Sequence, residues 1–128
     1  MVADEIPPPP EQPPSGGGGA TSVHIHDIDG ISFMDPVIDW KWRGEATITL
    51  RDDLGNPVAN AEVSGIWTGG YYGSGSCITG SDGTCSVQSG LIGTYRYSTT
   101  FTVTGITHGT LDYAPGDNND VDAYMRRP

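Results

Sequence analysis

Apolar and polar residues alternate most clearly in the segment "EATITLR" at residues 45–51. Ala46, Ile48 and Leu50 share one face of an extended chain, and the residues between them are polar. Alternation with a period of two is typical of a β-strand that buries one face. The segment therefore predicts a strand with these three side chains in a core.

The same pattern recurs later in the chain. In "VANAEVSGIW", Ala61 and Val63 alternate with Glu62 and are expected to point inward. In "YRYSTTFTVTGI", which predicts one long strand, Phe101 and Val103 are expected to point inward. Shorter strands are expected in "SVHIHDI", "CITG", "TCSV", "GTLDYA" and "VDAYM".

These segments make about seven or eight short strands, separated by turn signals such as "DDLGNP" and "SDG". No helical periodicity of useful length occurs, and 19 glycines with little Lys or Glu also disfavour helices. Regularly spaced short strands are typical of sandwiches and barrels. The sequence therefore predicts an all-β fold, an Ig-like antiparallel β-sandwich.

Residues 1–21 differ from the rest in composition, because "PPPPEQPP" and "SGGGG" offer no apolar pattern that could be buried. Pro-rich segments act as extended spacers and Gly-rich segments as flexible ones. We interpret residues 1–21 as a disordered linker and residues 22–128 as one domain. A linker in this position predicts an upstream domain as a partner.

The chain has six Lys and Arg residues against sixteen Asp and Glu, a formal net charge of −10. Such a charge repels phosphate backbones and anionic lipid surfaces, which disfavours nucleic acid as a partner. No segment is apolar enough to span a bilayer, so membrane insertion is not expected.

Cys77 and Cys85 flank "ITGSDGT", whose Gly and Asp residues favour a turn. A hairpin turning there would bring the two side chains to disulfide distance across a strand pair. We expect a Cys77–Cys85 disulfide, the alternative being two reduced thiols of an intracellular protein.

The segments "LRDDLGNPVANAEVSGIW", "GSCITGSDGTCSV" and "TFTVTGIT" together resemble the bacterial Ig-like domains of the invasin and intimin type. The longer order, from "HIHDIDG" through Trp40 and Trp42 to "VTGITHGTLDY", is similar to C-terminal modules of secreted bacterial hydrolases, notably subtilisin-like proteases. The resemblance implies a secreted, non-catalytic accessory module. The cysteines and both acidic ends depart from the invasin type, so an adhesin role is not carried over.

Catalysis is not expected from the residues themselves. The nucleophile motif G-x-S-x-G is absent, and the three histidines His24, His26 and His108 follow no triad pattern. Glycoside hydrolysis requires a pair of carboxylates at a set separation. Such a pair could lie among the twelve Asp residues, but Glu45 and Glu62 are the only glutamates in the expected strands, and Glu62 is predicted to point outward.

The aromatic residues allow two interpretations. Exposed aromatic rings in a row bind sugars by stacking on their apolar faces, whereas buried rings fill a sandwich core. Trp40 and Trp42 would share one face if that stretch is extended. The residues concerned are Trp40, Trp42, Trp67, Tyr71 and Tyr72. The sequence predicts an accessory module stabilised by calcium, and a carbohydrate-binding module that uses these rings is the alternative. The expected partner is a polysaccharide or an extracellular protein.

Acidic residues are concentrated at both ends of the domain. If the first and last strands are neighbours, "HDIDG" and "DNNDVD" meet and offer the oxygen ligands that calcium prefers. The predicted calcium ligands are Asp27, Asp29, Asp117, Asn119 (or Asn118), Asp120 and Asp122. Solvated acidic turns are the alternative, and His24 with His26 is a weaker candidate for a transition metal.

Overall fold

The computed structural model describes residues 19–128, and these residues form a two-layered β-sandwich. Most of the predicted linker, residues 1–18, lies outside the described residues. Within residues 19–128 the elements are β1 (Ser22–Met34), β2 (Lys41–Asp52), β3 (Glu62–Gly69), β4 (Gly73–Ile78), β5 (Thr84–Gln88), β6 (Ile92–Gly93), β7 (Ser98–Thr107), β8 (Asp112–Tyr113), the 3-10 helix η2 (Pro115–Asp117) and β9 (Asp122–Arg126). The predicted all-β sandwich is confirmed.

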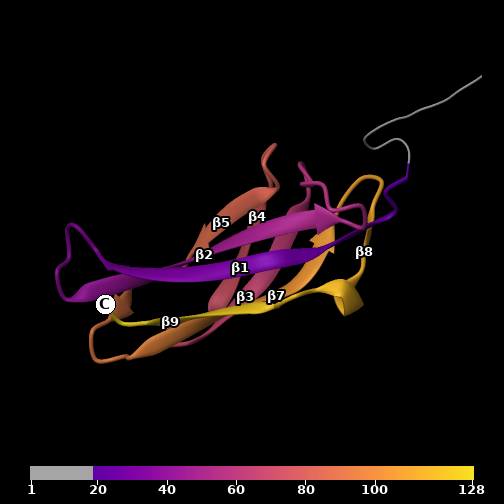
Figure 1. Ribbon diagram of the computed structural model, residues 1–128. Helices are drawn as coiled ribbons and strands as arrows, with labels where there is room; N and C mark the ends of the chain where they lie inside the picture. Colours follow the sequence, from indigo (N-terminus) through magenta and orange to yellow (C-terminus); the bar gives the residue numbers. More distant parts are fainter. Residues whose placement is uncertain (1–18) are drawn as a thin grey trace, which may run out of the picture.

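Figure 1 shows the two layers, one with β1, β2 and β5 and the other with β3, β4, β7 and β9. The first sheet has the order β5-β2-β1-β8, with β6 also paired to β2, and the second has the order β4-β3-β7-β9. The pairs between described strands are antiparallel except β1 with β8. The β1–β8 pair is parallel because the chain crosses from β7 to the other sheet and then runs alongside the start of β1.

The core lies between the two sheets. Burial alternates along the whole of β2, and the inward positions Ala46, Ile48 and Leu50 are fully buried, as predicted. On the facing sheet, Phe101 and Val103 of β7 are also buried, as predicted. The Phe101 ring lies directly on Gly65 of β3, where a Cβ atom would overlap it.

The disulfide between Cys77 and Cys85 is present, with their Cα atoms 5.8 Å apart. The predicted hairpin is wrong, because β4 pairs with β3 and β5 pairs with β2. The chain does turn between Gly80 and Gly83, but the carbonyl of Gly83 then accepts a hydrogen bond from the backbone of Leu50 in β2. The disulfide therefore joins the edge strands of two different sheets.

The strands run along the long axis of the sandwich, so the loops that connect them lie at its two ends (Figure 1). One end carries the loops 35–40, 70–72 and 94–97 together with the C-terminal residues. The opposite end carries the start of β1 and the loops 53–61, 79–83 and 108–111.

Candidate functional site

Asp27 and Asp29 lie on the outer face of β1, opposite Thr49 and Thr47 of β2. Both side chains are exposed. The hydrogen-bonding and negative charge of Asp27 raise the pKa of Asp29 above its ordinary value. The two negative charges on this face of β1 therefore repel one another.

The acidic segment at residues 117–122 lies beside β1, as predicted, but its side-chain hydrogen bonds to β1 come from asparagines. Asn118 accepts a hydrogen bond from the backbone N–H of Ile25 at 2.7 Å and donates one to the Tyr113 hydroxyl at 2.7 Å. The Asn119 side chain donates to the carbonyl of His26 at 2.9 Å, and its backbone N–H donates to the carbonyl of Ile25 at 3.0 Å. These amides fix the C-terminal segment to the edge of β1.

The acids of this segment are exposed. Asp120 accepts hydrogen bonds from the backbone of Val121 at 2.8 Å and of Asp122 at 3.4 Å. Asp117 ends η2, and Asp122 begins β9 opposite Thr102. Among residues 19–128, no group of three or more His, Cys, Asp or Glu side chains is placed to hold a metal ion. Calcium binding therefore stays a prediction.

The histidines do not form the paired face that the sequence suggested. The pairing of β1 with β2 shifts between Ile25 and Asp27, so that His26 is an extra, exposed residue in a β-bulge. His24 is half-buried beside Arg51. His108 caps a turn, because its Nδ1 accepts backbone hydrogen bonds from Thr110 at 3.1 Å and Leu111 at 3.2 Å.

Two of the candidate ligand-binding tryptophans are core residues. Trp42 is fully buried and its indole N–H donates to the carbonyl of Gly93 at 3.3 Å, and Trp67 is buried against Phe101 with ring centroids 4.9 Å apart. Tyr71 is half-buried and meets Trp67 edge to face at 6.4 Å. A surface role for Trp42 and Trp67 is therefore wrong, because both point into the sandwich from inward positions of β2 and β3.

Trp40 and Tyr72, by contrast, are exposed. An extended chain would place Trp40 and Trp42 on the same face, but the two residues differ. Strand β2 begins only at Lys41, so Trp40 lies in the preceding loop. Two further tyrosines, which were not among the predicted ligand-binding residues, lie at the same end. The exposed rings are Trp40 (58% exposed), Tyr72 (74%), Tyr95 (71%) and Tyr97 (71%). We call this end of the sandwich the aromatic end.

Three of these rings line one cleft of about 330 Å³, together with Arg96 and with Gly69 and Gly70, which have no side chains to fill it. Tyr72 comes from the loop between β3 and β4, whereas Tyr95 and Tyr97 come from the loop between β6 and β7. We call it the tyrosine cleft. The sequence predicted one long strand over residues 95–106, which placed Tyr95 and Tyr97 inside a strand. The strand β7 begins only at Ser98, so both tyrosines lie in the loop before it.

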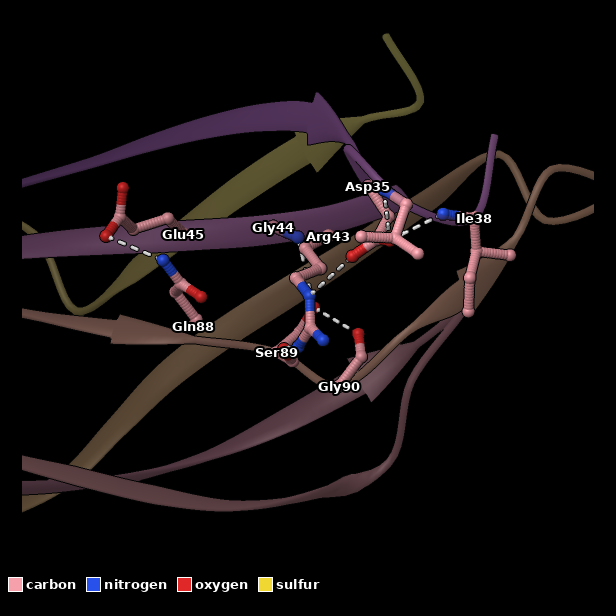
Figure 2. A network of polar contacts seen from close by, with 9 residues as sticks. Asp35, Ile38, Arg43, Gly44, Glu45, Gln88, Ser89 and Gly90 are labelled. Atoms are coloured by element: carbon pink, nitrogen blue, oxygen red, sulfur yellow. Dashed lines mark hydrogen bonds and ion pairs between the residues drawn. The ribbon is translucent and has the colours of Figure 1, made fainter. Parts of the chain in front are cut away.

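A network of polar contacts fixes the base of the aromatic end (Figure 2). Asp35 accepts hydrogen bonds from the backbone N–H groups of Val37 at 3.0 Å and Ile38 at 2.8 Å and forms an ion pair with Arg43 at 3.6 Å. These contacts lower the pKa of Asp35. Arg43 also donates to the carbonyl of the buried Ser89 at 3.1 Å. The loop that carries Trp40 is thereby tied to the segment between β5 and β6.

No protein-family model, no curated protein and no solved structure matches this chain. The resemblance drawn from the sequence motifs is therefore an expectation that these comparisons leave untested. Within residues 19–128, no helix has the length and apolar character needed to cross a membrane.

Proposed function

We propose that this chain is a non-catalytic carbohydrate-binding module of an extracellular protein. The observation that carries the proposal is the tyrosine cleft, in which three exposed rings from two loops line one shallow, open cleft. Aromatic side chains offer large apolar surfaces together with a polar hydroxyl, which suits the mixed faces of a sugar ring. Exposed aromatic residues that gather in a concave site are a stronger indication of a ligand than isolated ones.

The extracellular location is supported by the Cys77–Cys85 disulfide, since structural disulfides persist mainly in oxidising compartments. The motif resemblance to accessory modules of secreted bacterial hydrolases agrees with this location. In such an arrangement the module would hold a polysaccharide while an upstream domain acts on it.

Binding to a panel of soluble and insoluble polysaccharides, measured by pull-down and calorimetry, tests the proposal. Tyr72→Ala, Tyr95→Ala and Tyr97→Ala are each expected to weaken binding by about tenfold, because each removes one stacking surface. Tyr124→Ala is the matched control, since Tyr124 is 63% exposed but lies on β9 outside the tyrosine cleft.

Two results would contradict the proposal. One is that no polysaccharide in the panel is retained by the folded protein. The other is that Tyr124→Ala weakens binding as much as the three cleft variants do. Melting curves of all four variants show whether any loss reflects unfolding.

A further inference from the structure

The charges of this protein are distributed unevenly along the sandwich. The whole chain has a formal net charge of −10 and only six Lys and Arg residues. All of them except Arg51, which lies near the opposite end, are at or beside the aromatic end: Lys41, Arg43, Arg96, Arg126 and Arg127. Five of the six basic residues thus lie at the end that carries the exposed aromatic rings, where the loop 35–40 contributes two acids, Asp35 and Asp39.

These cations are largely without acidic partners. Within residues 19–128, Arg43 with Asp35 is the only ion pair. Arg96 is exposed and lines the tyrosine cleft. Unpaired cations in a protein with an excess of acids are free to bind an anion from outside.

Three of the cations lie over exposed aromatic rings of the same end. The distances to the ring centroids are 4.2 Å for Lys41 on Trp40, 5.4 Å for Arg96 on Tyr95 and 4.6 Å for Arg127 on Tyr97. Such contacts hold a cation beside a flat apolar surface. Each pair therefore places a positive charge beside an exposed aromatic ring.

Most acids in the loops lie at the other end of the molecule. There they occupy the loops between β2 and β3, between β4 and β5, and around β8 and η2: Asp53, Asp82, Asp112, Asp117 and Asp120. An anionic ligand is repelled from that end and attracted to the aromatic end, within the screening length of about 8 Å at physiological salt.

We propose that the ligand of the tyrosine cleft is an acidic polysaccharide, whose sugar rings stack on the tyrosines while its carboxylates bind Arg96 and its basic neighbours. This inference rests on the proposed carbohydrate-binding function and specifies its ligand class. A guanidinium group matches a carboxylate in geometry and can donate two parallel hydrogen bonds to it. Arg96 in the wall of the cleft is placed to make that contact beside a stacked ring.

An acidic polysaccharide fits these observations better than a nucleic acid. A nucleic acid carries a phosphate on every nucleotide and needs an extended basic surface, whereas here the cations are confined to one end of an acidic domain. The disulfide also favours an extracellular ligand.

The test compares two ligands with the same backbone, polygalacturonate and its full methyl ester, which lacks the negative charge. Calorimetry is run with the complete chain at low and at physiological salt. We expect polygalacturonate to bind at least tenfold more tightly than the ester, and its affinity to fall as salt rises. A neutral glucan and single-stranded DNA complete the set of probes.

Arg96→Gln removes the charge of the cleft while keeping a polar side chain of similar reach. We expect it to weaken binding of polygalacturonate roughly tenfold and to weaken binding of the methyl ester much less, so that the preference for the acidic ligand is lost. Arg51→Gln is the matched control at the opposite end of the sandwich, and it should change neither affinity.

The outcomes separate this inference from the proposed function. If the methyl ester or the glucan binds as tightly as polygalacturonate and Tyr95→Ala abolishes that binding, the module binds carbohydrate but the acidic ligand is wrong. If no polysaccharide binds, both proposals fail. If single-stranded DNA binds more tightly than polygalacturonate, the ligand class is a nucleic acid and the inference is overturned.

Discussion

Asp27 and Asp29 project from the same face of β1, two residues apart, and this spacing has an energetic consequence. The pKa of Asp29 is raised because ionising it places a second negative charge beside Asp27. At neutral pH the native state therefore contains a repulsion that the more expanded unfolded chain largely avoids. The sheet holds this pair together at some cost to its stability.

Replacing Asp29 by Asn should stabilise the protein at pH 7. The native-state pKa of Asp29 is raised, so protonation of Asp29 relieves the repulsion as the pH falls through that pKa. The stability advantage of Asp29→Asn should therefore shrink as the pH falls and vanish below the ordinary pKa of about 3.8. Melting temperatures between pH 3 and pH 8, measured with a chelator present, check this. Asp122→Asn, an exposed aspartate on β9, is the control. A lower melting temperature for Asp29→Asn at pH 7 would contradict the prediction.

The aromatic residues show where sequence reasoning about single residues succeeds and where it stops. The alternation around Trp67 predicted that Ala61 and Val63 point inward but left the position of Trp67 open, and Trp40 and Trp42 looked equivalent until the start of β2 at Lys41 separated them. Tyr95 and Tyr97 have the same parity as the inward Phe101, so alternation alone would bury them. Their exposure follows from the place where β7 begins, which the pattern does not determine.

At the scale of elements, the edge strands β4 and β5 are the ones joined covalently. β4 has only β3 as a partner and β5 has only β2, so each leaves one edge without a strand among the described residues. The Cys77–Cys85 disulfide links these two edges across the layers of the sandwich. A cross-link between sheets keeps the two sheets from separating, and it also reduces the number of conformations open to the unfolded chain.

Reducing the disulfide should therefore lower stability. The cysteines are eight residues apart, and closing so short a loop contributes on the order of 2–3 kcal/mol in the chain-entropy model. Unfolding in denaturant with and without a reductant measures this loss. The double variant Cys77→Ala and Cys85→Ala should show a similar loss and no further response to the reductant. Two reactive thiols in the air-oxidised native protein would contradict the assignment.

The sequence predicted strands and their inward faces well but not which sheet each strand joins. Alternation with a period of two is a local property, and it was correct for β2, β3 and the core part of β7. The sheet that a strand joins depends on pairing between segments far apart in the sequence. One example is the backbone hydrogen bond between Leu50 and Gly83, which lies beside the pairing of β5 with β2. The disulfide was predicted correctly from spacing because either arrangement brings the two cysteines together.

At the scale of the whole molecule, the two ends of the sandwich have opposite chemical character. The aromatic end has exposed rings and cations, and the other end has the acidic loops. The network of Asp35, Arg43 and Ser89 holds the first end, and Asn118 and Asn119 fasten the C-terminal segment to β1. The ligand binding proposed for the aromatic end and the repulsion between Asp27 and Asp29 can therefore be varied separately in experiments.

Calcium is the remaining prediction for the acidic residues, and the repulsion between Asp27 and Asp29 is the observation that keeps it worth testing. A divalent cation that binds only the folded state at a hundred times its dissociation constant would add roughly 2.7 kcal/mol to stability. We expect millimolar calcium to raise the melting temperature above that in chelator, and Asp27→Asn and Asp29→Asn to abolish the rise. Magnesium and sodium chloride at equal ionic strength are the controls, because screening alone relieves repulsion in a protein with a net charge of −10. A melting curve that responds equally to all three salts would leave Asp27, Asp29 and the C-terminal aspartates as surface charge, since a specific site must distinguish calcium from ions that only screen.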